Sequence, residues 1–432
     1  MRKILLPLAF IFLFWNGVYA DNHQKLPTAQ NLSDLVQEAL SNNPGLEAAM
    51  QRVLSAERMI PQAGSLPDPR ITLGLMNLPI NSFAFNQEPM TGKQISIMQM
   101  FPFPGKLSLS AEMAEFEAAA VKYQQREISN HIVMIVKQTY YDLYAVDRAL
   151  ETVQKNKDLM GQLVQIAEIK YATGSGLQQD VLRAQVERSK LEDDMIMWQQ
   201  KRLAIVAKLN GILNRPVGTP IGPTSSELAL PENEDLGFSP QDIENQRPLI
   251  LAWKEKLGKS DTAIELARKD AWPGFAVGMG YSQRDDLKNG AKMYDFLSVS
   301  VTLDIPLFYG RKQGEKIAQK KLDFEAAQAE YRNVLNGVLA ESESQKAELE
   351  RNRKRVELYQ GGIILQAEQS FESAQAGYQV GKVDFLNIVD NWVRLQTYEL
   401  QYHFALSGYH KALAGYDFAV GRDSIRTKEL QD

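Results

Sequence analysis

The longest regular pattern of apolar positions in the chain lies between residues 107 and 171. This stretch of 65 residues contains no proline and a single glycine, Gly161. Twelve positions, ten of them apolar, recur at steps of three and four, with a slip before Leu143: Ile132, Ile135, Thr139, Leu143, Val146, Leu150, Val153, Lys157, Met160, Val164, Ala167 and Tyr171. A repeat near 3.5 residues predicts a helix that winds around its neighbours, and this one would be about 98 Å long. A two-stranded coiled coil is the commonest structure with this pattern. The slip marks where we expect the packing or curvature to change.

The segments around the long helix predict shorter helices and strands. Alternation of apolar with small or polar residues is typical of strands, and prolines and glycines mark where helices end. The expected order is a helix at 31–60 interrupted at Pro44 and ended from Pro61, strands at 70–78 and 93–101, the long helix at 107–171, a turn, and a helix at 180–213 with Asp180 as a candidate N-cap.

The same order of landmarks occurs a second time. Residues 245–248 parallel 41–44, residues 273–278 parallel 69–74 and Pro306 parallels Pro102, all at an offset of 204, while residues 378–381 parallel 171–174 at 207. Residues 384–386 match 180–182 after a three-residue deletion, which predicts a shorter second turn. A shared offset at separate landmarks predicts a tandem duplication of one unit.

The duplication divides the chain into two repeats. We expect a signal peptide at 1–20, a first repeat at 21–216, an irregular connector at 217–240 and a second repeat at 241–432. The second repeat is expected to contain strands at 274–283 and 294–304, a long helix at 312–378, a turn, and a helix at 384–421.

The composition of the chain limits where the protein can be located and which classes of partner it can bind. Arg2 and Lys3 precede an apolar run and the small residue Ala20, which is the pattern of a secretory signal peptide. Without those two cations the chain has 46 basic and 53 acidic residues, a net charge of −7, which disfavours nucleic acid as a partner. The chain has no cysteine, so an exported fold must be held by packing or oligomerisation rather than disulfides.

The alternating segments are compatible with a half-buried sheet in water and also with strands inserted in a membrane. No apolar run after the signal peptide is long enough for a membrane-spanning helix, so insertion would require strands with apolar side chains facing lipid. Aromatic residues gather at both ends of the segments, as at membrane interfaces: Phe101, Phe103, Trp272, Phe308 and Tyr309 near the helices, and Phe83, Phe85 and Tyr294 on the other side. Four strands cannot close a barrel. Two chains would give eight strands and a filled interior, and three would give twelve strands and an open lumen.

Several short motifs resemble a known family. They are residues 66–69 (LPDP), 103–106 (FPGK), 171–174 (YATG) and 180–185 (DVLRAQ), in a duplicated frame. Together they resemble the TolC family of outer membrane efflux proteins over almost the whole mature chain. Residues 89–93 and 99–102 are most similar to the heavy-metal efflux (CzcC/CusC-like) branch.

The resemblance implies both architecture and partners. The fold class would be a mixed α and β membrane protein, a homotrimer whose twelve-stranded β-barrel in outer-membrane lipid is continuous with a long periplasmic α-helical barrel. Its function would be that of a passive exit duct in a tripartite efflux system, with heavy-metal cations as candidate cargo. The partners would be a periplasmic adaptor protein and an inner-membrane transporter of the resistance–nodulation–division type.

No group of residues predicts catalysis or a cofactor. The histidines His23, His131, His403 and His410 have no neighbouring nucleophile and no metal-ligand spacing, so we expect packing or surface roles. Met76, Met90, Met98 and Met100 cluster near the predicted strands. Thioethers suit Cu(I), but fillers of the barrel or its loops are the favoured interpretation.

The two helix turns are the best candidate sites. The resemblance places acidic residues around the periplasmic entrance, and by motif these positions are Asp384 and Asn387, with Asp180 in the first repeat. A ring of carboxylates favours cations. Asp180 and Asp384 are also candidate helix N-caps. Adaptor docking is expected at the tips of the turns: Thr173, Gly174, Ser175, Gly176, Leu177, Val380, Gly381 and Lys382.

Two other classes of protein share some of these features. A periplasmic adaptor has a signal sequence and a long helical hairpin, but normally one hairpin between β-rich domains. A coiled-coil structural protein of the envelope needs no strands. Both are expected to stay soluble without detergent, unlike an outer-membrane duct.

Overall fold

The computed structural model describes residues 31–226, 228–231 and 236–422. The predicted signal peptide at 1–20 and His23 lie outside these residues. None of the helices in the described ranges combines the length and the apolar character needed to cross a membrane.

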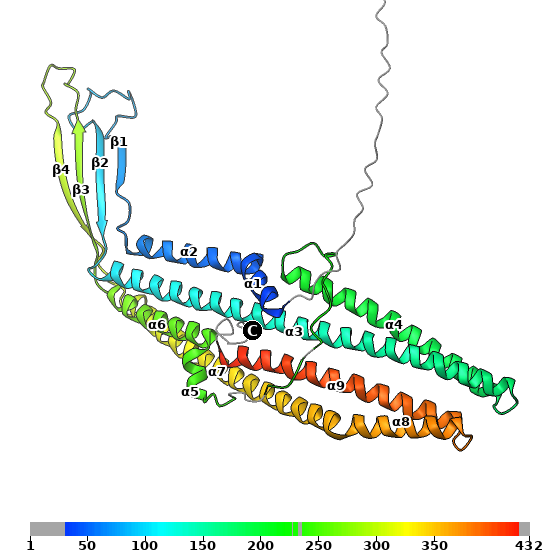
Figure 1. The fold of residues 1–432 in the computed structure, drawn as a ribbon. Helices are drawn as coiled ribbons and strands as arrows, with labels where there is room; N and C mark the ends of the chain where they lie inside the picture. The colour runs from blue at the N-terminus through cyan, green and yellow to red at the C-terminus, as the bar shows by residue number, and fades with distance from the viewer. Residues whose placement is uncertain (1–30, 227, 232–235, 423–432) are drawn as a thin grey trace, which may run out of the picture.

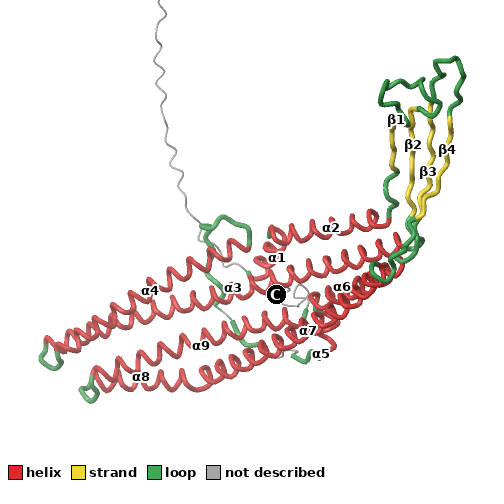
Figure 2. The backbone as a smooth tube through the Cα atoms, turned by 180° about the vertical axis from the view of Figure 1, so that it is seen from behind, coloured by secondary structure: helices red, strands yellow, loops and turns green. Residues whose placement is uncertain are grey.

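The duplicated order of elements is confirmed. The first repeat contains α1 (Leu32–Asn42), α2 (Pro44–Gly64), β1 (Arg70–Met76), β2 (Gly92–Phe101), α3 (Lys106–Ala172) and α4 (Gln178–Ile212). The second contains α5 (Pro240–Gln246), α6 (Pro248–Lys269), β3 (Phe275–Gln283), β4 (Phe296–Leu303), α7 (Gln313–Leu358), the π-helical turn η1 (Tyr359–Ile363), α8 (Ile364–Gln379) and α9 (Phe385–Val420). The strands stand at one end of the molecule, and the α3–α4 and α8–α9 turns lie at the other (Figures 1 and 2).

Two helices differ from the prediction. Pro61 does not end α2, which continues to Gly64. A proline in the last turn removes only one backbone bond, and side chains add others, since the Ser65 hydroxyl donates to the Pro61 carbonyl oxygen at 2.6 Å. The second long helix is interrupted by η1, which contains Gly361 and Gly362. Short π turns within a helix depend on local hydrogen bonding and have no apolar periodicity to reveal them.

The four strands form one antiparallel sheet in the order β1-β2-β3-β4. Leu73 lies opposite Ile95, Ile95 opposite Tyr281 and Tyr281 opposite Leu297, so one face of the sheet is apolar across all four strands. The other face carries mostly small or polar residues, such as the facing pair Gly278 and Ser300, with a few larger apolar ones such as Met98. The two repeats meet where β2 pairs with β3, while β1 and β4 each have one neighbour and leave an open edge.

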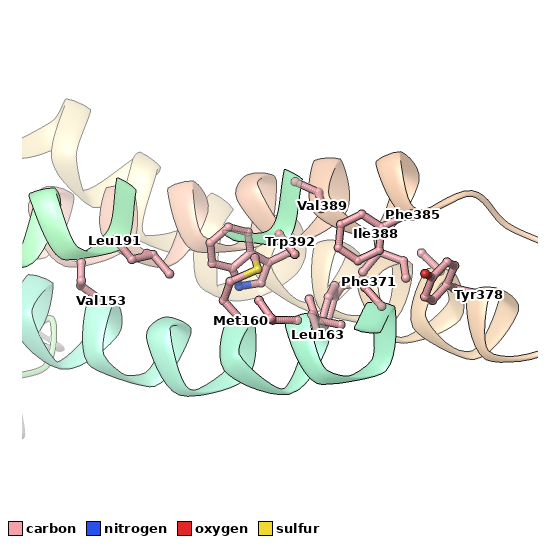
Figure 3. Packing of buried hydrophobic residues seen from close by; sticks show 14 residues of the cluster. Val153, Met160, Leu163, Leu191, Phe371, Tyr378, Phe385, Ile388, Val389 and Trp392 are labelled. Atoms are coloured by element: carbon pink, nitrogen blue, oxygen red, sulfur yellow. The ribbon is translucent and has the colours of Figure 1, made fainter. Parts of the chain in front are cut away.

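The apolar pattern of α3 forms the centre of the helical part. Eight of its twelve pattern positions are buried: Ile132, Thr139, Leu143, Val146, Val153, Met160, Val164 and Ala167. Near the turns, the α3 residues pack against α4, α8 and α9, where Trp392 and Met160 lie side by side (Figure 3). Between Thr139 and Ala149 nearly every residue is buried, which confirms that the packing changes at the slip in the repeat.

Candidate functional site

The two turns at the far end of the helices have the same backbone structure. In the first, the Ser175 N–H donates to the Lys170 carbonyl oxygen at 2.9 Å and the Gly174 N–H to Tyr171 at 3.0 Å. In the second, the Lys382 N–H donates to Gly377 at 2.8 Å and the Gly381 N–H to Tyr378 at 3.0 Å. Both are Schellman motifs, which require a left-handed residue. The two glycines supply it, with φ of +70° and +75°.

The prediction of a shorter second turn is wrong. Residues 173–177 connect α3 to α4, and residues 380–384 connect α8 to α9, so both turns have five residues. The offset of 207 therefore continues through the turn without a deletion. As a result, Asp180 is the counterpart of Asn387, each the third residue of its helix, and Asp384 is the counterpart of Leu177.

The capping interpretation of the two aspartates is also corrected. Leu177, not Asp180, is the N-cap of α4. Asp384 does occupy the N-cap of α9, but its side chain accepts no capping hydrogen bond. Asp384 and Asn387 are exposed and Asp180 is half-buried. Within the described part of the chain, no ion pair or side-chain hydrogen bond engages either carboxylate.

A contact between the hairpins lies directly beside these residues. The Lys170 ammonium donates to the Tyr378 carbonyl oxygen at 2.6 Å and stands 4.4 Å from the centre of its ring. Burial, with a smaller contribution from the Asp180 charge, raises the pKa of the Tyr378 hydroxyl. This link joins α3 to the end of α8. The sequence did not predict it because the two residues are 208 positions apart and no pattern within one helix pairs them.

The predicted docking tips form the extreme end of the molecule. Leu177 and Val380 expose 60% and 70% of their surface there, beside the exposed Lys382. The Thr173 and Ser175 hydroxyls bond to each other at 2.9 Å and to backbone carbonyls of α3, which fixes the shape of the first tip.

The four methionines do not form one cluster. Met76 lies opposite Gly92 and Met98 opposite Arg70, so the two are separated by six residues along β2, or about 20 Å. Met90 lies in the loop between β1 and β2. No cluster of three or more His, Cys, Asp or Glu side chains suited to a metal ion occurs in the residues that the structure describes.

The histidines on α9 have packing positions. The ring of His410 stacks on Tyr141 at 4.9 Å, and its Nε2 donates to the Ala229 carbonyl oxygen at 3.0 Å. His403 bonds through Nδ1 to the Tyr144 hydroxyl at 3.2 Å.

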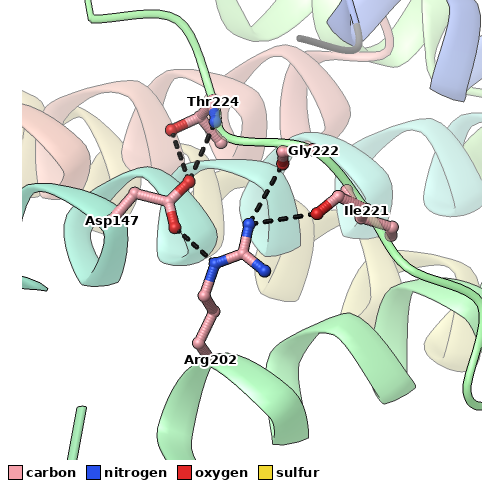
Figure 4. Close-up of polar contacts among 5 residues, drawn as sticks. All are labelled: Asp147, Arg202, Ile221, Gly222 and Thr224. Carbon is pink, nitrogen blue, oxygen red and sulfur yellow. Dashed lines mark hydrogen bonds and ion pairs between the residues drawn. The ribbon is translucent and has the colours of Figure 1, made fainter. Parts of the chain in front are cut away.

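A buried polar cluster centred on Asp147, which we call the anchor, holds the start of the connector against α3 and α4. One oxygen of the Asp147 carboxylate accepts from Arg202 Nε at 2.7 Å, and the other accepts from the backbone N–H of Thr224 at 2.9 Å and its hydroxyl at 3.1 Å (Figure 4). The Arg202 guanidinium also donates to the carbonyl oxygens of Ile221 and Gly222. The anchor thereby ties α3, α4 and the connector together. A charged residue inside the apolar pattern of α3 was its only signal in the sequence.

Comparison with known proteins gives a consistent result. The family model described as "Outer membrane efflux protein" matches residues 35–215 and 239–421. The chain is 22% identical to the outer membrane protein TolC of Vibrio cholerae, covering 85% of each chain. It is also 22% identical to the cobalt-zinc-cadmium resistance protein CzcC of Cupriavidus metallidurans, covering 98% of this chain and 100% of the relative. A crystal structure of CusC superposes with a TM-score of 0.76 at 18% identity, covering 92% of this chain and 93% of that one.

Proposed function

The chain belongs to the outer membrane efflux protein family, and we propose that three copies of it assemble into the conducting unit. It is an outer membrane efflux channel of a tripartite efflux system that reaches into the periplasm, and it is not an enzyme. The observation that supports a trimer is the four-stranded sheet with an open edge at β1 and another at β4. Pairing β4 of one copy with β1 of the next removes all edges, and twelve strands leave a lumen.

We propose that Asp384 and Asp180 line the periplasmic entrance. Threefold symmetry would bring three copies of each carboxylate around one axis, where they favour cations. The carboxylates are not engaged by other side chains in the described residues, which supports this role.

Replacing Asp384 with alanine is expected to lower the cation-to-anion permeability ratio about fivefold. The reason is that a unit charge about 4 Å from an ion in water contributes about 1 kcal/mol. The measurement is the reversal potential of the purified channel in a planar bilayer under a salt gradient. Asn387→Asp adds a carboxylate at the counterpart of Asp180 and is expected to change selectivity in the opposite direction. Unchanged reversal potentials in both variants would exclude the ring.

We propose that the tips defined by residues 173–177 and 380–382 bind a periplasmic adaptor, which connects the channel to an inner-membrane transporter of the resistance–nodulation–division type. Each tip exposes an apolar side chain, Leu177 on the first and Val380 on the second, and this supports a docking role, because neither is covered within the described chain.

Lys382→Glu is expected to reduce adaptor cross-linking about tenfold. The substitution removes the positive charge that would pair with an acidic adaptor residue, and it places a negative charge opposite that residue. Because the chain has no cysteine, Ser175→Cys provides a single attachment point for the cross-linker. Lys354→Glu on α7, which is also exposed but far from the tip, is the control. Full cross-linking and export by the Lys382 variant would remove the tips from the interface.

We propose transition-metal cations as the cargo, in line with the heavy-metal branch. The match to the cobalt-zinc-cadmium resistance protein extends over the full length of that relative, which supports this assignment. Cells lacking the protein are expected to become sensitive to Co²⁺, Zn²⁺ or Cd²⁺ and not to organic dyes. Sensitivity to dyes alone would assign an organic cargo and leave the channel function intact.

A further inference from the structure

The turn that joins β4 to α7 exposes an apolar surface that nothing in the described chain covers. Ile305, Leu307, Phe308 and Tyr309 expose 67%, 80%, 73% and 51% of their surface. The basic pair Arg311 and Lys312 follows directly and is also exposed. We refer to residues 305–312 as the junction turn.

The junction turn has a fixed backbone. The Leu307 N–H donates to the Ile305 carbonyl oxygen at 2.9 Å, and the N–H groups of Arg311 and Lys312 both donate to Phe308 at 3.1 and 3.0 Å. The Gly314 N–H donates to Tyr309 at 2.7 Å, which connects the turn to the first residues of α7. The apolar side chains are therefore held outward by a structured turn, and burying them elsewhere requires a partner.

The equivalent turn of the first repeat has its partners within the chain. Phe103 stacks on Trp272 with ring centres 5.6 Å apart, and Lys106 pairs with Asp270 at 2.9 Å. Lys316 of α7 pairs with the same carboxylate. The second copy carries one additional residue before its glycine and makes no such contacts among the described residues. Within one chain the junction turn therefore lacks the contacts that cover its counterpart in the first repeat.

The position of the junction turn identifies the surroundings of its side chains. In the sequence, Ile305 and Leu307 continue the alternation of Val301 and Leu303 beyond the end of β4. The turn lies where the sheet meets the long helices (Figures 1 and 2). In an outer membrane channel this level is the periplasmic surface of the membrane, where aromatic side chains favour the headgroup region.

The charges near the junction turn favour an anion. Five cations lie on it or on the adjoining helix ends, namely Lys106, Lys269, Arg311, Lys312 and Lys316, against the carboxylates of Asp270, Asp304 and Glu315. Asp270 is already paired with two of the lysines. Within the described residues no ion pair engages Arg311 or Lys312, so both can bind a phosphate.

We propose that the junction turn is a binding site for an anionic glycerophospholipid of the periplasmic leaflet, with Arg311 and Lys312 on the phosphate and Phe308 and Tyr309 at the glycerol level. The proposal rests on the outer-membrane location of the channel. Basic residues beside an apolar anchor are the usual means of recognising anionic lipid surfaces. A neutral lipid offers the same apolar layer but no net charge to the basic pair.

Native mass spectrometry of the purified full-length protein tests the proposal. Titration with short-chain phosphatidylglycerol is expected to give adducts that phosphatidylcholine does not. The double variant Arg311→Ala, Lys312→Ala is expected to bind phosphatidylglycerol about twenty-five-fold more weakly, since each basic residue at an anionic surface contributes about fivefold. The double variant Arg351→Ala, Lys354→Ala removes two exposed charges from the last turns of α7, far from the junction turn, and is expected to bind like the wild type.

Two further experiments distinguish a lipid from free phosphate and from a neighbouring copy of the chain as the group that contacts the junction turn. Inorganic phosphate that displaces phosphatidylglycerol at equal concentration would show a phosphate site rather than a lipid site. A bimane label on Phe308→Cys is expected to be quenched by brominated phosphatidylglycerol in reconstituted bilayers. Absence of quenching would mean that a neighbouring copy covers the turn and would overturn the proposal. Conductance in phosphatidylcholine bilayers reports the channel function independently of either result.

Discussion

Replacing Asp147 with alanine is expected to destabilise the protein by about 3 kcal/mol. The Asp147 side chain is 6% exposed and neutralises Arg202, whose side chain is 25% exposed. Its removal leaves a guanidinium without its ion pair and the backbone N–H of Thr224 without its acceptor. Breaking one partner of a largely buried pair costs several kcal/mol, and an unsatisfied buried donor adds about 1–3 kcal/mol.

Denaturant unfolding in detergent, followed by helical circular dichroism, measures this loss. The matched control is Asp142→Ala, also on α3, whose carboxylate pairs with Lys411 at 2.6 Å. Both side chains of that pair are more than one third exposed, so its removal is expected to cost about 0.5 kcal/mol. Equal losses in the two variants would contradict the anchor role. Because the anchor holds the connector against α3 and α4, the unfolding transition of Asp147→Ala is also expected to broaden.

Much of the fold follows from local patterns in the sequence. The 3.5-residue repeat predicted α3 because one face of that helix is buried along its length. The alternation in 93–101 and 274–283 predicted strands because the side chains do face opposite sides of the sheet. The duplication was visible because proline and glycine mark the turns of both copies. The helix and the strands depend on residues within one element, and the duplication depends on the spacing of landmarks along the chain.

The remaining features depend on contacts between distant residues or on backbone hydrogen bonding. Matching 384–386 to 180–182 by residue type misplaced the second turn, whereas the spacing of Gly174 and Gly381 gives the correct equivalence. The link of Lys170 to Tyr378 joins residues 208 apart, and no pattern in one helix reveals it. The π turn η1 changes the hydrogen bonding of a helix without changing its apolar pattern.

Acid is expected to destabilise the helical part as the pH falls from 6.5 towards 4. Burial lowers the pKa of both His403 and His410 from 6.5 to about 4, assisted by the positive charges of Arg148 near the first and Lys137 near the second. The Ala229 carbonyl oxygen partly opposes the effect at His410. The unfolded chain therefore binds protons below pH 6.5 that the folded chain does not bind until about pH 4, and stability decreases across that window.

The expected loss at His410 is about 3 kcal/mol between pH 6.5 and pH 4, because one pKa unit corresponds to about 1.4 kcal/mol. Carboxylates titrate in part of the same window, so the informative quantity is the difference between the wild type and His410→Gln. Glutamine keeps a donor for the Ala229 carbonyl oxygen but takes up no proton, and its unfolding free energy is expected to decrease less on acidification. His403→Gln provides an independent second comparison, since its ring bonds to Tyr144 instead. Parallel pH profiles in the wild type and both variants would mean that the histidines gain protons equally in the folded and unfolded states. Such a result would require the α3–α9 interface at Tyr141 and Tyr144 to admit water.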